Sequence, residues 1–138
     1  MSPDDTWKRL NHDALKHASE NNWGLFSNTQ LKMADYLLAE GKQRQALSMF
    51  LWVCYLDLND GNNHGSLTSK EFPAFNPASG FLAPDVVKKV VQLKDAMELS
   101  AAEVQTVFME TVQKRRNKLM PMGPAKAWQK INAVLQAS

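Results

Sequence analysis

Oxygen-bearing side chains recur at short intervals between Asp60 and Glu71. Asn62 and Ser66 lie between these two carboxylates, and Gly65 stands in the middle of the segment. A calcium ion takes about six to eight hard oxygen ligands, and a glycine lets the backbone bend sharply enough for such ligands to converge. Only two of the side chains are carboxylates, so the spacing predicts a calcium site of low affinity.

Residues 60–72 resemble the EF-hand calcium loop. Asp60 stands at the first position of that pattern, Gly65 at the sixth and Glu71 at the twelfth, whereas His64 occupies a position that normally carries an oxygen ligand. The resemblance implies a ligand set of Asp60, Asn62, Ser66 and Glu71. The chain has no second loop of this kind to pair with it.

A second candidate chemistry is the recognition of DNA bases. Residues 93–107 resemble a helix-turn-helix, with Glu98 at the position where the turn glycine is expected. The resemblance implies that a recognition helix begins at Ser100 and enters the major groove. The side chains that it implies for contacts with bases and phosphates are Gln105, Thr106, Arg115, Arg116 and Lys118.

Catalytic residue patterns are missing from the sequence. The three histidines are His12, His17 and His64. The first two are five residues apart, which does not place them on one helical face, so solvent-facing histidines are the expectation. No nucleophile elbow, phosphate-binding loop or dinucleotide fingerprint is present. We therefore expect no enzymatic activity, no small-molecule substrate and no cofactor other than calcium.

Aromatic side chains are the strongest signal for a protein interface. Trp7, Trp52 and Trp128 fall at helical spacing and are expected in the core. Other aromatic residues fall in predicted irregular segments, where an exposed apolar patch would mark an interaction site. These candidate interface residues are Trp23 and Phe26, in a short connector, and Phe72, Phe75 and Phe81, in a long loop.

The elements that position these residues centre on the unbroken apolar run Met49–Leu56. A surface helix would show polar residues between its apolar positions, and this run has none. The run is also far shorter than the roughly 20 apolar residues that span a bilayer. We expect a buried central helix in which Cys54 acts as a small apolar side chain.

The apolar spacing predicts an all-α bundle of about six helices and no strand. Helix starts are expected at Ser2–Pro3, at Ser27 or Asn28, just after Gly41, at Pro84, at Ser100 and at Pro124. We expect one domain over residues 1–138, with an N-terminal helix and hairpin over 2–58 and C-terminal helices over 84–137. A long irregular loop over 59–82 separates these two parts.

Residues 28–58 resemble one unit of the tetratricopeptide repeat. In that repeat a glycine ends the first helix, and an alanine and an aromatic residue follow at fixed spacing on the second. Gly41, Ala46 and Phe50 have this spacing. The resemblance implies an antiparallel helical hairpin at the centre of the domain.

Composition limits the function classes. Sixteen basic and fourteen acidic residues give a formal charge of +2, which is too balanced to imply binding to nucleic acid or a membrane surface. One cysteine and an N-terminus without an apolar signal region favour a cytoplasmic location. The sequence thus predicts a protein–protein interaction module, acting as an adaptor, assembly factor or self-associating subunit. DNA binding through 93–118 and calcium binding through 60–71 remain as alternatives.

Overall fold

Six α-helices make up the regular structure of the computed structural model, which describes residues 3–20, 23–60, 82, 84–115 and 122–137. The helices are α1 (Pro3–Ser19), α2 (Trp23–Ala39), α3 (Gln43–Asp60), α4 (Pro84–Ala96), α5 (Ala101–Arg115) and α6 (Pro124–Ala137). No strand occurs within these ranges. The predicted all-α architecture is confirmed.

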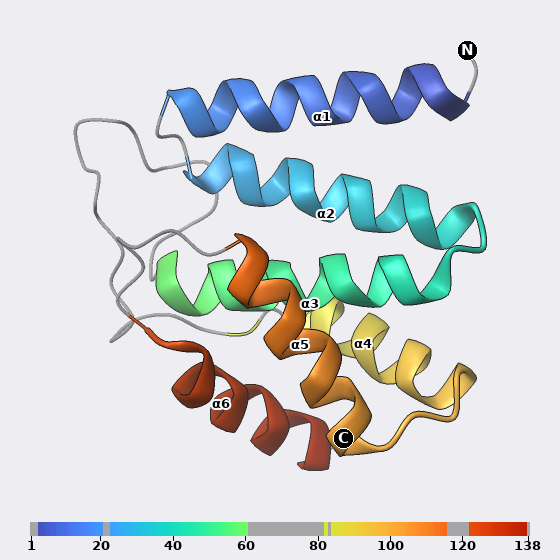
Figure 1. Ribbon diagram of the computed structural model, residues 1–138, viewed down its shortest axis with the longest axis vertical. Coiled ribbons are helices and arrows are strands. Elements are labelled where there is room, and N and C mark those ends of the chain that lie inside the picture. The colour runs from blue at the N-terminus through green and yellow to red at the C-terminus, as the bar shows by residue number, and fades with distance from the viewer. Residues whose placement is uncertain (1–2, 21–22, 61–81, 83, 116–121, 138) are drawn as a thin grey trace.

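Helix α3 is the element on which the others pack. Helices α1, α2 and α3 lie side by side and alternate in direction, and α5 crosses steeply in front of α3 (Figure 1). Helix α3 contacts α2, α4, α5 and α6, while α1 packs principally on α2. This arrangement explains why α3 has no polar residue along Met49–Leu56, since neighbouring helices cover that part of it on several sides.

The apolar run Met49–Leu56 is buried as predicted, because none of its residues is more than 3% exposed. Cys54 lies within it as a free thiol. Burial raises the pKa of the Cys54 thiol far above its ordinary value, and the neighbouring charge of Asp57 raises it further. The thiol is therefore a neutral core group, not a reactive one.

Aromatic rings link α3 to the C-terminal helices in a continuous row. Trp52 stacks on Tyr55 at a centroid distance of 5.9 Å, and Tyr55 meets the edge of Phe108 on α5 at 6.0 Å. Phe108 in turn contacts Trp128 on α6 at 5.6 Å. Such ring pairs add about 0.5–1.5 kcal/mol each to the stabilisation from burial. The row fixes α5 and α6 against α3.

The α2–α3 connection is the tight helical hairpin that the sequence predicts. Gly41 adopts a φ of 78°, and its N–H donates to the carbonyl of Leu38 while the N–H of Lys42 donates to Leu37. This pair of hydrogen bonds ends α2 in the manner that favours glycine. The likeness of the hairpin to a tetratricopeptide unit stays a prediction.

The α4–α5 connection uses the same geometry without a glycine. Glu98 adopts a φ of 55°, and the N–H groups of Glu98 and Leu99 donate to the carbonyls of Asp95 and Lys94. The predicted capping box then begins α5. The Ser100 N–H donates to Glu103 Oε1 at 3.0 Å, and the Glu103 N–H donates to Ser100 Oγ at 3.1 Å. Hydrogen bonding of the Glu103 carboxylate to Ser100, above all to the Ser100 N–H, lowers the pKa of Glu103.

Three local predictions are wrong. Residues 23–26 are not a connector, because α2 already begins at Trp23. Ser27 does not cap the helix: its hydroxyl is buried and donates to Asp57 Oδ1 on α3 at 3.4 Å. The end of α3 also extends two residues into the expected loop, through Asp60.

Candidate functional site

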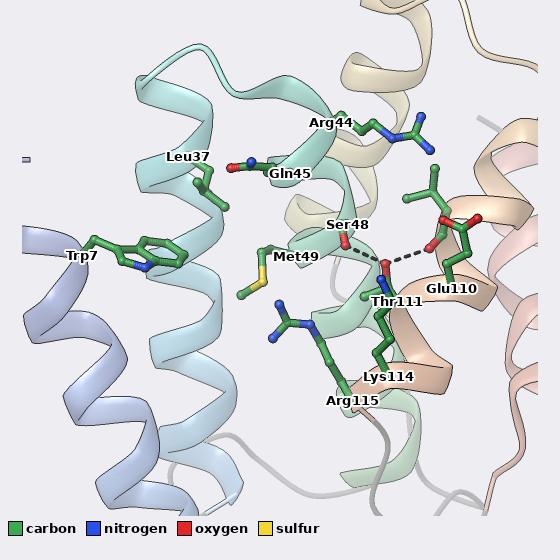
Figure 2. A pocket seen from close by; sticks show the side chains of 11 residues that line it. Trp7, Leu37, Arg44, Gln45, Ser48, Met49, Glu110, Thr111, Lys114 and Arg115 are labelled. Atoms are coloured by element: carbon green, nitrogen blue, oxygen red, sulfur yellow. Dashed lines mark hydrogen bonds between the residues drawn. The ribbon is translucent and has the colours of Figure 1, made fainter. Parts of the chain in front are cut away.

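A pocket of about 390 Å³ opens where α1 and α2 face α5 across α3 (Figure 2). Four helices contribute to it, so no single stretch of sequence contains it. Its lining residues are Trp7, Leu37, Arg44, Gln45, Ser48, Met49, Val107, Glu110, Thr111, Lys114 and Arg115. We refer to it as the α3–α5 pocket.

One wall of the α3–α5 pocket is apolar. Trp7 on α1 is half-buried, and its ring lies 6.0 Å from the ring of Tyr36 on α2 at a tilt of 34°. Leu37 and Met49 are buried beside it. In Figure 2 the Trp7 and Leu37 side chains stand on the side opposite α5, with Met49 between them and α5. An apolar group that enters from solvent would find its contacts at this wall.

A pair of hydroxyl groups joins the two helices at the base of the pocket. Ser48 Oγ on α3 lies 2.5 Å from Thr111 Oγ1 on α5, and Thr111 Oγ1 donates to the carbonyl of Val107 at 2.7 Å. A hydroxyl carries one hydrogen, so Ser48 is the donor in the first of these bonds. Both hydroxyl hydrogens are thus used within the protein. Toward a ligand in the pocket, Ser48 and Thr111 can therefore only accept hydrogen bonds.

The remaining polar lining is predominantly cationic. Arg44, Lys114 and Arg115 face one acidic lining residue, Glu110. All four are exposed to solvent, and within the described part of the chain none of the three cations forms an ion pair. Partial burial of the guanidinium lowers the pKa of Arg115, although an arginine stays charged at any physiological pH. The Arg115 side chain extends from the end of α5 into the pocket (Figure 2).

A second pocket, of about 320 Å³, lies between α1 and α2 and contains Asp13, His17 and Asp35. Asp35 already binds Lys89 of α4. The Nδ1 of His17 lies 3.8 Å from Glu20 Oε1. Across the described ranges, no group of three or more His, Cys, Asp or Glu side chains could hold a metal ion. The residues of this pocket therefore form no metal centre.

The two histidines that the structure describes differ in their exposure to solvent. His12 is exposed, as expected. His17 is half-buried in the second pocket, so the expectation of a solvent-facing side chain is wrong there, because α2 covers that side of α1. His64 lies outside the described residues.

Of the predicted interface residues, the structure describes only the side chain of Phe26, so their grouping stays a prediction. Phe26 is half-buried and packs against the hydrophobic core from the first turn of α2. Trp23 is the first residue of α2, and its side chain is outside the described set. Phe72, Phe75 and Phe81 also lie outside the described residues. The α3–α5 pocket is therefore a different candidate interface.

The residues predicted to contact DNA separate on α5. Gln105 and Thr106 are exposed on the outer face of the helix, whereas Arg115 lines the α3–α5 pocket. Arg116 and Lys118 lie outside the described residues. Helices α4 and α5 each pack on α3 and are not among the helix pairs with extensive mutual contact. A helix-turn-helix requires packing between its two helices, so this arrangement departs from the motif.

The predicted calcium ligands fall mostly beyond the described ranges. Asp60 is the last residue of α3, and its side chain is not described. Asn62, Ser66 and Glu71 lie outside the described residues. Calcium binding by this loop stays a prediction.

Sequence reasoning did not find the α3–α5 pocket, although a signal for it was present. The first half of α3 carries Arg44, Gln45 and Ser48, and the last half of α5 carries Thr111 and Lys114. Ser48 follows Gln45 by three residues and Arg44 by four, and Lys114 follows Thr111 by three, which are spacings that share one helical face. Each of these polar stripes lies beside apolar residues of the same helix. That pattern is expected where α3 and α5 both border a partly solvated pocket.

No helix in the described ranges combines the length and apolar character needed to cross a membrane.

The chain was also compared with known proteins. No family model, curated protein or solved structure matches the chain.

Proposed function

We propose that this protein is a non-enzymatic protein-interaction module and that its partner binds in the α3–α5 pocket. One observation supports this most strongly: the pocket joins an apolar wall to three solvent-exposed cations that form no ion pair with any described residue. Protein interfaces combine an apolar centre with a polar rim in this way. The cytoplasmic location expected from the sequence is part of the proposal.

The residue types at the pocket also suit an interface. Tryptophan, methionine and arginine are enriched at protein interfaces, and the pocket contains Trp7, Met49, Arg44 and Arg115. A volume of about 390 Å³ is near the lower end of the usual range for ligand sites. It accommodates a few side chains, so a partner would reach it with a protruding or extended segment.

Site-directed photo-crosslinking tests this proposal. The exposed Gln45 is replaced by p-benzoylphenylalanine at the pocket, and the exposed Gln129 of α6 is replaced in a control protein. After irradiation in an extract of the source cells, we expect a protein adduct at position 45 that is missing at position 129. Equal adducts at both positions, or no adduct at position 45, would contradict binding at the pocket. Light scattering of the same samples shows whether the adduct is a second copy of this chain.

DNA binding is retained as the second candidate because of one backbone observation. Glu98 adopts the left-handed conformation that the turn of a helix-turn-helix requires, and α5 starts directly after it with a complete cap. Glu103 counts against this candidate, because it places a negative charge near the start of the helix that would read the DNA. Titration of a labelled DNA duplex at two salt concentrations tests this candidate. Affinity that falls steeply with salt, together with a sequence preference that Gln105→Ala relaxes, supports it, and no binding at low salt excludes it.

A further inference from the structure

We infer that the α3–α5 pocket binds an acidic protein segment, in which carboxylates flank one apolar side chain. This inference rests on the proposed function, because it names the chemistry of the partner that would occupy the same pocket. The observations behind it are the charge of the lining, the division of the pocket into two parts, and the hydrogen bonds already made inside it.

Charge complementarity gives the first argument. Arg44 at the start of α3 and Lys114 and Arg115 at the end of α5 all line the pocket, and Glu110 is the one acidic residue among the described residues that line it. The chain as a whole is nearly neutral, so this excess of positive charge is local. Opposite charges across an interface accelerate association and exclude partners of like charge. Carboxylates are therefore the groups that gain most from entering here.

The state of Arg115 gives a second argument. Its guanidinium loses part of its hydration at the pocket, and no carboxylate among the described residues replaces that hydration. A planar guanidinium binds a carboxylate through two parallel hydrogen bonds, which suits a site that is partly shielded from water. A partner carboxylate at this position would restore the lost interaction.

The pocket also contains a place for an apolar side chain. The ring of Trp7 and the side chain of Met49 lie on the side away from Lys114 (Figure 2). The hydroxyl groups of Ser48 and Thr111 have committed their hydrogens to each other and to a backbone carbonyl. They therefore cannot donate to a ligand, and the cations remain the principal donors. One apolar anchor between carboxylates fits this division.

The same observations favour a protein segment over a nucleic acid. A nucleic acid backbone needs a row of cations that follows its phosphates. Here the carboxylates of Glu103 and Glu110 interrupt the surface of α5. The apolar wall at Trp7 also contacts side chains better than it contacts phosphates. DNA is therefore an outcome of the test that would contradict the inference.

Selection from a phage-displayed library of random 12-residue peptides tests the inference on the full chain. We expect the enriched sequences to share at least two Asp or Glu residues near one Leu, Met or aromatic residue. The best peptide is synthesised with a fluorescent label, together with a matched version in which Asp becomes Asn and Glu becomes Gln. Anisotropy should show affinity for the acidic peptide that is at least about tenfold higher and that falls with added salt.

Charge reversals then locate the site. Arg115→Glu and Lys114→Glu should each weaken binding of the acidic peptide by roughly tenfold or more, because repulsion replaces attraction. Lys130→Glu, at an exposed position on α6 outside the pocket, makes the same change in net charge and should leave the affinity within about twofold. Equal losses in all three variants would mean that only net charge matters, and would overturn the inference.

The remaining outcomes separate the inference from the proposed function. If the selected peptides are neutral or basic, and Gln45→Trp blocks them whereas Gln129→Trp does not, the pocket binds proteins but the acidic partner is wrong. If no peptide is enriched and position 45 gives no crosslink, both the proposed function and the inference of an acidic partner are contradicted. If a DNA duplex displaces the acidic peptide and binds more tightly, the site recognises phosphates and the inference is overturned.

Discussion

The hydroxyl of Tyr55 donates a hydrogen bond of 2.5 Å to the backbone carbonyl of Met122. Asn59, one turn later on α3, accepts a bond of 2.8 Å from the N–H of the same residue. Asn59 in turn donates to the carbonyl of Tyr55 at 3.0 Å. Two side chains of the central helix thus satisfy both polar backbone groups of a buried residue that precedes α6.

Tyr55→Phe should destabilise the fold by about 1–2 kcal/mol, because it leaves the buried Met122 carbonyl without its Tyr55 donor. The ring and its aromatic contacts remain. Asn59→Ala should cost a similar amount, and the double variant should cost less than the sum, since both bonds hold one residue. Urea denaturation measures these differences. Thr106→Val removes an exposed hydroxyl and should change stability by less than about 0.5 kcal/mol. Strict additivity would show that the two bonds act independently.

Glu98→Gly should stabilise the protein by about 1 kcal/mol, because a non-glycine residue at positive φ carries a steric cost of about that size. Gly41→Ala is the matched opposite change. A Cβ at Gly41 would meet no atom within 4 Å, so its expected loss of about 1 kcal/mol comes from the backbone alone. Thermal melts of both variants test the pair. Destabilisation by Glu98→Gly would show that the Glu98 side chain contributes more than its strained backbone costs.

Cys54 should not react with a thiol reagent in the native protein. The thiol is 1% exposed, and burial keeps its pKa high, so both access and the reactive thiolate are missing. Labelling with a chromogenic disulfide should proceed only as fast as the protein opens, and should become fast in urea. Labelling of the native protein at the speed of a free cysteine would show that α3 is accessible without unfolding.

The cap of α5 should lose strength in acid. The hydrogen bonds from Ser100 lower the pKa of Glu103 in the folded protein, so the carboxylate stabilises the fold above its unfolded pKa. That contribution is lost as the pH falls through the lower, folded pKa. Glu103→Gln should therefore melt below wild type at pH 7, and the gap should narrow toward pH 3. A gap that stays constant over this range would mean that the charge of Glu103 is irrelevant.

The predicted calcium loop is tested by melting the protein in excess calcium and again in chelator. A ligand at about 100 times its dissociation constant adds roughly 2.7 kcal/mol, which shifts the midpoint of a domain of this size by several degrees. We expect Glu71→Gln to abolish the shift, and magnesium to give none. The same shift in wild type and variant would place the ion elsewhere in the chain.

Local chemistry made several elements predictable from sequence. The capping box at Ser100 and the proline at Pro124 act within one helical turn, and both helices start where these residues indicate. The buried run around Cys54 was equally clear, because an uninterrupted apolar stretch must be covered. These features depend on neighbours in the chain or on composition alone.

Features that depend on distant residues were not predictable. Ser27 has the chemistry of a helix cap, yet its hydroxyl is used on Asp57, 30 residues later. Only the packing of α2 on α3 brings Asp57 close enough to accept this hydrogen bond. The α3–α5 pocket shows the same limit, since Trp7 and Arg115 line it together although 108 residues separate them in the sequence. Their spacing in the sequence carries no record of this proximity.

The position of α1 at the edge of the fold has a consequence for dynamics. Helix α1 packs principally on α2, yet through Trp7 it supplies a wall of the α3–α5 pocket. Elements with few packed neighbours open at a lower free energy than the core, and their amide hydrogens exchange sooner. The backbone amides of α1 should therefore exchange before those of α3. Because α1 contributes Trp7 to the pocket, occupation of the pocket would appear as slower exchange of the α1 amides.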